Sequence, residues 1–295
     1  MDIRSKPQSK PDARTGDFYI SVATSGAERR PPRALKHGDT FAVFGDNGDA
    51  VGNAFGPAGL YYRDTRHLSH FVMSLDGEPP LLLSSNLQDD NAVLSVDLAN
   101  PDLHRGGRLA LPRDTIHVRR TTFLWQGACY VRLAVHNFDR QSHRIHLGLA
   151  FAADFRDLFE IRGNVRDRRG TLAIDRHDAS AIVMRYRGLD DVVRTTRLDF
   201  TPAAGTLTDD TAGFEIALAP GERTSIFLTI RCDADTPARP NAFFGAIRAA
   251  RRDLRAATSR AAVIDGSNAV LNRIMCRSVA DLYMLLNDTQ EGAYP

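Results

Sequence analysis

The feature that most constrains this chain is a strict alternation of apolar and other residues along its middle. Val131, Leu133 and Val135 alternate in this way, and the pattern recurs at 145–151, 214–218 and 226–230. Successive side chains of a strand point to opposite faces of a sheet, so each stretch predicts a strand with one buried face. Many such strands between residues 40 and 232 predict a mainly β fold, with antiparallel sheets packed as a large β-sandwich.

The composition is that of a globular protein with little net charge. The 295 residues are 43% hydrophobic and 25% charged, and the formal net charge is +2. Residues 1–36 hold 8 basic and 4 acidic side chains, so the other 259 hold 30 basic and 32 acidic, a net of −2. A body without excess positive charge gives no electrostatic reason to expect nucleic-acid binding.

The first 36 residues predict a flexible leader. They are rich in Pro, Arg and Lys, and apart from a possible strand at 18–22 they offer few large apolar groups to bury. They do not resemble a secretory signal, and no apolar run is long enough to span a bilayer. Cys129, Cys232 and Cys276 are widely spaced, which favours buried free thiols over disulfides. We therefore expect a cytoplasmic protein without membrane association.

Two tight turns predict hairpins. Asn47-Gly48 separates expected strands at 40–44 and 50–53, and Asp76-Gly77 separates expected strands at 71–75 and 80–83. Asn-Gly and Asp-Gly favour the two-residue turns that join neighbouring antiparallel strands.

The pattern changes after residue 235. Apolar residues then recur at steps of three and four, which predicts an amphipathic helix over 243–257, ending near Asp265-Gly266. A second helix is expected at 268–287, capped by Ser267 or Asn268. Its apolar stripe is broad, so we expect it to be buried against something large, and its place near the chain's end suggests that a further domain follows. The stripe consists of Leu271, Ile274, Met275, Val279, Leu282, Leu285 and Leu286.

The densest polar cluster lies at residues 60–69, where Arg63, Asp64 and Arg66 follow Tyr61 and Tyr62. Guanidinium groups, a carboxylate and aromatic faces are what a polyhydroxyl ligand such as a sugar would use. The same residues also fit a structural Arg–Asp–Arg network that locks a loop onto the sandwich. We favour the structural interpretation on the sequence alone.

A second cluster at 153–163 brings Asp154, Asp157 and Glu160 around Arg156 on an expected helical turn. Glycosidases use two carboxylates, so one interpretation is a general acid/base pair. A calcium site is another, although the regular ligand spacing is missing. Local arginine–carboxylate pairs are the interpretation we favour. The histidines and cysteines do not have the spacing of a metal site, so we expect no metal and no cofactor.

Taken in order, several strings resemble one family. They are the runs 36–44, 59–69, 80–85, 89–91 and 96–102, then Arg119-Arg120 with Leu124-Trp125, then 153–163 with Arg168-Arg169-Gly170. Together they resemble the N-terminal domain of bacterial and fungal glycogen debranching proteins of the amylo-α-1,6-glucosidase type. The resemblance covers about residues 36–232.

The resemblance implies a β-sandwich followed by a helical (α/α) toroid that holds the catalytic carboxylates. It implies a leader at 1–36, the sandwich at 37–235, and at 236–295 a helical linker with the first helix of a toroid that is otherwise absent. No catalytic residue carries over to this chain. The matching loop positions are candidates to contact the sugar or the toroid: Tyr62, Arg63, Asp64, Arg66, Asp89, Asp90, Asn91, Asp154, Phe155, Asp157 and Glu160.

We therefore expect a non-catalytic domain of an α-glucan-acting glycoside hydrolase. Its expected partners are the toroid in the same protein and an α-glucan or oligosaccharide, and neither a nucleic acid nor a membrane. Two alternatives stay open, an independent carbohydrate-binding module and a self-contained hydrolase that uses carboxylates on the sandwich. Asp89, Asp90 and Asn91 also fit ordinary turn chemistry, and Trp125 fits either the core or a sugar-stacking platform.

Overall fold

The structure, a computed structural model, describes residues 32–52, 56–87, 92–239, 242–258, 266–285, 287–289 and 292–294. Every feature below belongs to the unit Pro31–Pro295. The expected strand at 18–22 lies outside the described residues. Residues 33–36, expected at the end of the leader, belong instead to strand β1 (Arg33–His37), because they pair with the following strand.

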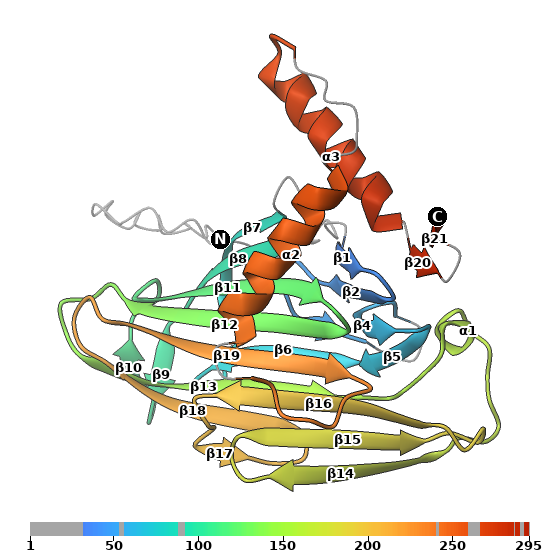
Figure 1. The fold of residues 1–295 in the computed structure, drawn as a ribbon. Helices are drawn as coiled ribbons and strands as arrows, with labels where there is room; N and C mark the ends of the chain where they lie inside the picture. The colour runs from blue at the N-terminus through green and yellow to red at the C-terminus, as the bar shows by residue number, and fades with distance from the viewer. Residues whose placement is uncertain are drawn as a thin grey trace, which may run out of the picture. The chain divides into compact units, whose positions relative to one another are not determined.

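In the described part of the chain, the strands form three main antiparallel sheets (Figure 1). The eight-stranded sheet has the order β14 (Thr171–His177), β15 (Ala181–Arg187), β16 (Val193–Thr201), β19 (Arg223–Cys232), β12 (Ala128–Asn137), β11 (Ile116–Trp125), β8 (Val93–Ala99), β7 (Leu81–Leu87). The five-stranded sheet has the order β17 (Thr206–Leu207), β18 (Thr211–Leu218), β13 (His143–Ala152), β6 (His70–Leu75), β3 (Ala50–Val51). The four-stranded sheet has the order β1, β2 (Thr40–Phe44), β4 (Gly59–Tyr62), β5 (Thr65–Leu68). Two small ribbons pair β9 (Leu103–Arg105) with β10 (Arg108–Leu111) and β20 (Asn287–Thr289) with β21 (Gly292–Tyr294).

One apolar core lies between the sheets. Leu198 and Ile182 come from the eight-stranded sheet, Leu147 from the five-stranded sheet and Leu60 from the four-stranded sheet, and all four belong to one buried cluster. The four expected alternations are confirmed, since all their apolar positions are buried in this cluster. These positions are Val131, Leu133, Val135, Ile145, Leu147, Leu149, Phe151, Phe214, Ile216, Leu218, Ile226, Leu228 and Ile230.

The two expected hairpins are wrong, because both turns are corners between sheets. β2 pairs with β1 and β4, whereas β3 pairs with β6, so the chain changes sheet at Asn47-Gly48. β6 pairs with β3 and β13, whereas β7 pairs with β8, so the chain changes sheet again at Asp76-Gly77. The first corner is fixed by Asp49, whose Oδ1 accepts hydrogen bonds from Arg120 Nη1 at 2.7 Å and from Met73 N at 3.2 Å.

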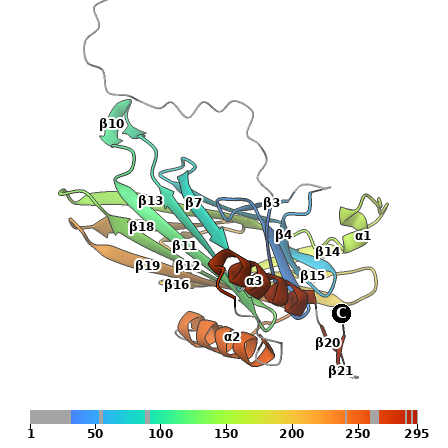
Figure 2. The ribbon, with the colours of Figure 1, turned by 90° about the horizontal axis from the view of Figure 1, so that it is seen from above.

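Helix α2 (Ala242–Thr258) lies on the outer face of the eight-stranded sheet (Figures 1 and 2). Its Phe243, Ala246 and Ala250 are buried in a second apolar cluster with Phe123 and Tyr130 of that sheet. The amphipathic helix expected at 243–257 is therefore confirmed.

Trp125 packs into the same cluster. Its side chain is partly buried there, and Nε1 donates a hydrogen bond to Asp253 Oδ2 of α2 at 3.1 Å. This position fits the core interpretation of Trp125, since α2 engages it.

Helix α3 (Ala269–Leu285) begins with the expected cap, because Asn268 Oδ1 accepts from Val270 N at 2.9 Å and from Leu271 N at 3.2 Å. Its apolar stripe is not buried as expected. Met275 and Val279 of the expected stripe are partly buried, and Leu286 lies outside the described residues. The other four expected positions are about half or more exposed, as is the neighbouring Val270: Leu271, Ile274, Leu282 and Leu285. The sequence pattern predicts burial, but the described residues of this chain provide no partner for the stripe.

Candidate functional site

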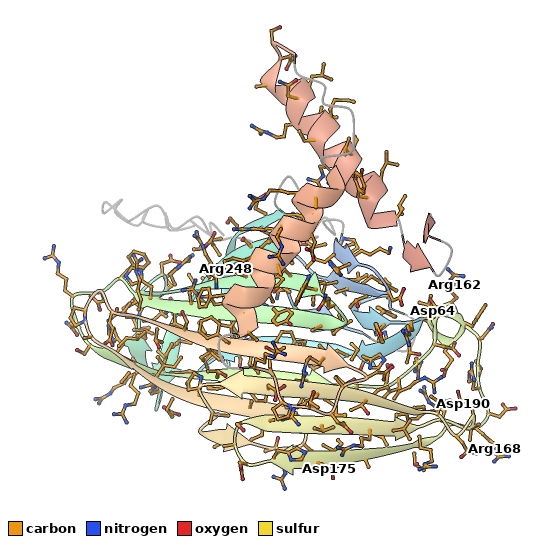
Figure 3. The ribbon with its side chains drawn as sticks, in the orientation of Figure 1. Asp64, Arg162, Arg168, Asp175, Asp190 and Arg248 are labelled. Carbon is orange, nitrogen blue, oxygen red and sulfur yellow. The ribbon has the colours of Figure 1, made fainter. Side chains whose placement is uncertain are left out.

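The two polar clusters of the sequence form one assembly at one end of the sandwich. The turn between β4 and β5 lies against the segment that contains helix α1 (Leu158–Ile161), and Figure 3 shows Asp64 and Arg162 at this same end. Arg66 N donates to Arg156 O at 2.8 Å, and Leu158 N donates to Asp64 O at 3.0 Å. Backbone hydrogen bonds therefore hold the two clusters together.

Arg66 joins the clusters through its side chain as well. It is fully buried, and its Nε donates to Asp154 Oδ1 at 3.0 Å while Nη2 donates to Asp154 Oδ2. Nη1 donates to Gly56 O at 2.8 Å and to Ala58 O at 3.3 Å. Burial lowers the pKa of the guanidinium, but the hydrogen bonds and charge of Asp154 raise it by more, so the net shift is upward. The Arg66–Asp154 pair acts as an internal clamp in this geometry.

Two glycines make room for this clamp. A Cβ on Gly59 (φ +145°) would lie 2.5 Å from Leu68 O and 2.7 Å from Arg66 Cδ. A Cβ on Gly52 would lie 2.6 Å from Ala58 O and 2.8 Å from Arg66 Nη1. Both contacts are too close for a real carbon atom, so these positions require glycine.

The β4–β5 turn has an unusual backbone. Tyr62 pairs with Thr65, and the two residues between them, Arg63 and Asp64, have φ values of 45° and 61°. Asn-Gly is the usual choice for such a turn, and each non-glycine residue here costs on the order of 1 kcal/mol. Arg63 and Asp64 are exposed at the tip, with Arg63 Nε 3.5 Å from Asp39 Oδ2. This backbone conformation keeps two charged side chains at the tip of the turn.

Phe155, another candidate, is an interior residue. It has φ 48° and is 3% exposed, and its ring stacks on Tyr186 with centroids 5.4 Å apart and contacts His67 edge-on, also at 5.4 Å. Tyr62 also contacts the His67 ring edge-on, with centroids 6.0 Å apart. The half-buried Tyr62 is therefore closer to the surface than Phe155.

His67 is a neutral interior histidine. Its Nδ1 lies 3.1 Å from Thr195 O, which can only accept, so Nδ1 carries the ring proton. Nε2 lies 3.9 Å from Asp233 Oδ1. Burial lowers the pKa of His67 to about 4, although the Asp233 carboxylate and the hydrogen bond to Thr195 raise it. With 1% of its surface exposed, His67 does not face a ligand.

Asp157 and Glu160 form a capping box at α1. Asp157 Oδ1 accepts from Glu160 N at 2.9 Å, and Glu160 Oε2 accepts from Asp157 N at 3.2 Å. Arg166 Nη2 also donates to Asp157, and Arg169 Nη1 donates to Glu160 Oε1 at 3.0 Å. Both carboxylates are engaged by backbone and guanidinium donors. This arrangement suits local pairing and does not suit the proton donor and nucleophile that a glycosidase needs.

The structure thus brings together eight of the eleven candidates: Tyr62, Arg63, Asp64, Arg66, Asp154, Phe155, Asp157 and Glu160. The remaining three, Asp89, Asp90 and Asn91, lie outside the described residues. The sequence-based set omitted Phe159, which is 63% exposed on α1, and the arginines 166 and 169. The signal that could have identified Phe159 is the D-x-x-E spacing from Asp157 to Glu160. This spacing predicts the start of a helix, and Phe159 lies inside its first turn.

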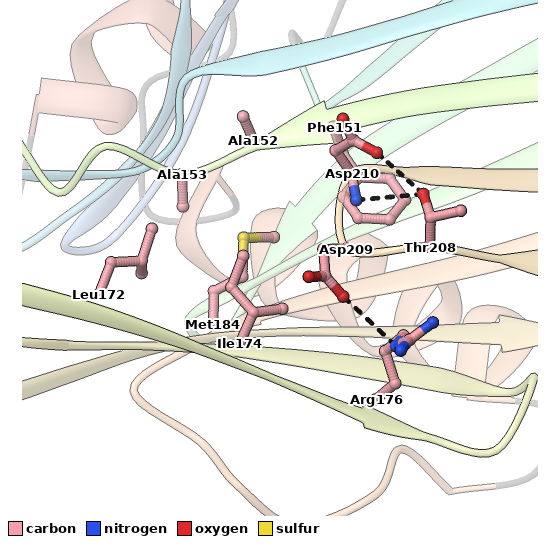
Figure 4. A pocket seen from close by; sticks show the side chains of 10 residues that line it. All are labelled: Phe151, Ala152, Ala153, Leu172, Ile174, Arg176, Met184, Thr208, Asp209 and Asp210. Carbon is pink, nitrogen blue, oxygen red and sulfur yellow. Dashed lines mark hydrogen bonds and ion pairs between the residues drawn. The ribbon is translucent and has the colours of Figure 1, made fainter.

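The open edge of the sandwich contains a separate groove of about 560 Å³ (Figure 4). Core side chains such as Met184 and Ile174 line it, and its polar residues bond one another: Arg176 Nε lies 3.3 Å from Asp209 Oδ1, and Thr208 Oγ1 donates to Asp210 Oδ1 at 2.8 Å. Within the described ranges, no three His, Cys, Asp or Glu side chains are placed to hold a metal ion.

The cysteines are free. Burial raises the pKa of the Cys129 thiol to about 12 and that of Cys232 well above its usual value, so both are unreactive. Cys276 is exposed on α3, contrary to the expectation that all three are buried. In the part of the chain that the structure describes, no helix has the length and apolar character needed to cross a membrane.

Comparison with solved structures gives remote likenesses. A candidate kojibiose phosphorylase from the human microbiome is 7% identical over 86% of this chain, with a TM-score of 0.45. This chain spans 36% of that protein's length. A galactose mutarotase-like protein from Clostridium acetobutylicum is 8% identical, with 68% of this chain and 95% of that chain covered and a TM-score of 0.43. A galactose mutarotase related enzyme from Lactobacillus acidophilus is 8% identical, with 70% and 98% covered and a TM-score of 0.40.

No protein with a curated description matches the sequence. A family model does match, and it covers residues 35–229, which is most of the described sandwich. Its description is the N-terminal domain of some glycogen debranching enzymes. The resemblance noted in the sequence is therefore confirmed, and this chain belongs to the family of glycogen debranching enzyme N-terminal domains.

Proposed function

We propose that this sandwich is a non-catalytic domain that supports the catalytic toroid of an α-glucan-acting glycoside hydrolase and shapes its substrate cleft. The activity in question is of the amylo-α-1,6-glucosidase type. The observation that carries the proposal is the exposed apolar stripe of α3. Successive residues of an α-helix are about 100° apart around its axis. On this basis, one face spanning roughly 120° of α3 contains the exposed apolar residues Val270, Leu271, Ile274, Leu282 and Leu285. A contiguous exposed apolar stripe favours a protein partner.

The end of the sandwich that carries the eight candidates adds a second support. The internal Arg66–Asp154 clamp and the α1 capping box fix the backbone, while Arg63, Asp64 and Phe159 stay exposed. Such side chains on a rigid base suit contact with a neighbouring domain or with sugar at its cleft. Arg162 and Arg168 are exposed on the same loop, and they add hydrogen-bond donors for hydroxyl groups.

The self-contained hydrolase is the weaker alternative, because Asp157 and Glu160 are paired. We expect the purified chain to release no glucose from glycogen limit dextrin. A reducing-sugar and glucose assay at high protein concentration checks this. Glucose release that the Asp157→Asn substitution abolishes would contradict the proposal and support the hydrolase.

The docking role of α3 has a direct test. The chain is mixed with the separately produced catalytic domain of a glycogen debranching enzyme of this family, and binding is measured by calorimetry. Ile274→Glu places a charge in the stripe and is expected to weaken binding roughly a hundredfold, because burying an unpaired carboxylate costs several kcal/mol.

The matched control for this test is Arg273→Glu, since Arg273 is exposed on the same helix but outside the stripe. It is expected to change the affinity by less than about threefold. Equal weakening by the two variants, or wild-type chain that does not bind, would argue against docking through the stripe. Circular dichroism confirms that each variant keeps its fold.

A further inference from the structure

A second candidate site lies on the outer face of the eight-stranded sheet, on different elements from the first. A cleft of about 730 Å³ is enclosed by β16, β19, the connector that follows β19, and the first turn of α2. The connector crosses in front of β16 (Figure 1). The volume is within the range of about 300–1,000 Å³ that small-molecule sites occupy. None of the eight candidates described above lines this cleft.

One wall of the cleft is aromatic. Phe227 of β19 and Phe243 and Phe244 of α2 contact one another, with each pair of ring centroids 5.5 Å apart. Phe243 is buried beneath the helix, whereas Phe244 is 44% exposed. The wall therefore presents a fixed apolar surface whose outer ring is accessible to a ligand.

The floor of the cleft is polar and rigid. Arg197 is only 5% exposed, and its Nε donates to Asp199 Oδ1 at 2.8 Å while Nη1 donates to Asp235 O at 3.0 Å. Asp199 Oδ2 accepts from Ala238 N at 3.3 Å, which ties the connector to the sheet.

Two further donors lie on this floor. Arg197 and Thr229 both line the cleft, and only 5% and 7% of their surfaces are exposed. A guanidinium and a hydroxyl can both donate hydrogen bonds, so a ligand that enters the cleft with acceptor oxygens can bond to them.

The charges of the cleft decide which acceptor fits. Arg197 and Arg239 line it together with Asp178, Asp199 and Asp235. Arg231 Nη2 lies 3.7 Å from Asp199 Oδ2 and Arg185 Nη2 lies 3.4 Å from Asp235 Oδ1, so the charges around the cleft are nearly balanced. They give little attraction to a phosphate or an acidic peptide. A hydroxyl-bearing neutral molecule can accept from Arg197 and donate to the carboxylates. Its C–H face can lie on the phenylalanine wall, and a hexose has both properties.

We propose that this cleft binds a short neutral oligosaccharide, with Phe244 covering a sugar face and Arg197 and Thr229 bonding its hydroxyls. The cleft alone calls for an uncharged hexose unit. That the sugar is an α-linked glucan rests on the proposed function. The site would hold the chain of a branched glucan on a surface separate from the end of the sandwich that carries Arg63 and Asp64.

Calorimetric titration of the full chain tests this, with maltotetraose, cellotetraose and inorganic phosphate as probes. Maltotetraose is expected to bind, and Phe244→Ala and Thr229→Val are each expected to weaken it roughly tenfold, which corresponds to about 1.4 kcal/mol. Thr229→Val keeps the side-chain shape and removes only the hydroxyl. Phe138→Ala is the matched control, because Phe138 is an exposed phenylalanine, 62% exposed, that does not line the cleft.

Three outcomes overturn the assignment: no sugar binds, phosphate binds in place of sugar, or the cleft variants bind as tightly as the wild type. Binding of cellotetraose alone would keep a sugar site and remove the α-glucan. The result is separable from the docking test, which depends on α3. A chain that docks the catalytic domain and binds no sugar contradicts only the cleft, and the reverse result contradicts only the proposed function.

Discussion

Arg66→Met is expected to lower the free energy of unfolding by about 3–5 kcal/mol, which is the usual cost of removing one partner from a buried ion pair. Methionine fills a similar volume but removes the buried guanidinium partner of Asp154, which then keeps only the longer contact of Arg156 Nε with its Oδ2 at 3.5 Å. It also removes the donor for Gly56 O and Ala58 O. Because 27% of the Asp154 side chain is exposed, water compensates for part of the loss, and the lower end of this range is expected. Urea denaturation measures the effect, provided that the dependence of the free energy of unfolding on urea concentration is the same in both proteins.

Two further variants show whether the unpaired charge causes the loss. Arg63→Met is the control, since the Arg63 side chain is 68% exposed in its pair with Asp39, and it should cost less than about 1 kcal/mol. The double variant Arg66→Met with Asp154→Leu should be more stable than Arg66→Met alone, because neither charge is then left buried. An Arg66→Met midpoint that matches that of Arg63→Met would refute the clamp.

His67 is expected to make the fold sensitive to acid. In the folded chain its pKa is about 4, against the ordinary value of 6.5 for an exposed histidine. Between these two pH values the unfolded chain binds a proton that the folded chain excludes, so unfolding becomes more favourable as pH falls from about 6.5 to about 4. The loss is about 3 kcal/mol at pH 4 and constant below it, and above pH 6.5 the term vanishes.

The groups around the ring support this direction. The Asp233 carboxylate favours the protonated form from one side and Arg194 disfavours it, while burial makes the largest contribution and favours the neutral ring. Carboxylates elsewhere in the chain also titrate in this pH range. The effect of His67 is therefore taken as the difference in stability between the wild type and a His67 variant. Stability is followed by denaturation from pH 4 to pH 7.5 for wild type and for His67→Asn, whose amide can still donate to Thr195 O.

The wild-type curve should fall below the variant curve by about 3 kcal/mol over this range, after subtraction of their constant offset at pH 7.5. His67→Phe keeps the ring contacts with Tyr62 and Phe155 and should show the same flattened pH dependence, whatever its stability at neutral pH. His177→Asn is the control at an exposed histidine and should follow the wild type. Parallel curves for all four proteins would exclude a role of His67 in acid sensitivity.

The strands could be predicted from the sequence because their pattern is a local property. Val131, Leu133 and Val135 alternate since each must face the core from one strand, whatever its neighbours are. The caps and amphipathic pattern of the helices are local in the same sense, and Asn268 caps α3 as expected.

The corners could not be predicted, because a turn motif fixes only the reversal of the chain. Asn47-Gly48 favours a tight turn whether the following strand stays in the same sheet or enters another one. Whether the next strand pairs with the previous one depends on Asp49, and its partner Arg120 lies 71 residues away. The assembly of the candidate site could not be predicted for the same reason, since Arg66 and Asp154 are 88 residues apart in the sequence.

The cleft on the outer face of the eight-stranded sheet could not be predicted from the sequence, for another reason. Arg197, Asp199 and Thr229 lie on two strands, and Phe244 lies on a helix, so they form no motif along the chain. Their outward position becomes clear only once the alternation of β16 and β19 is combined with the placement of α2. By contrast, Asp157 and Glu160 stood out as a carboxylate pair, although the sequence rule for capping boxes already explained their spacing.

The position of β19 in the eight-stranded sheet governs the order in which this domain can be made. β19 is the last strand of the sandwich along the chain, yet it lies between β16 and β12 in the middle of the sheet. Without β19, the strands made earlier can pair only as two separate parts of this sheet, with β12 and β16 as unpaired inner edges. Free edges of this kind invite pairing with other chains. The eight-stranded sheet can therefore be completed only after β19 is available, and we expect its two inner edges to be most open to wrong pairing before then.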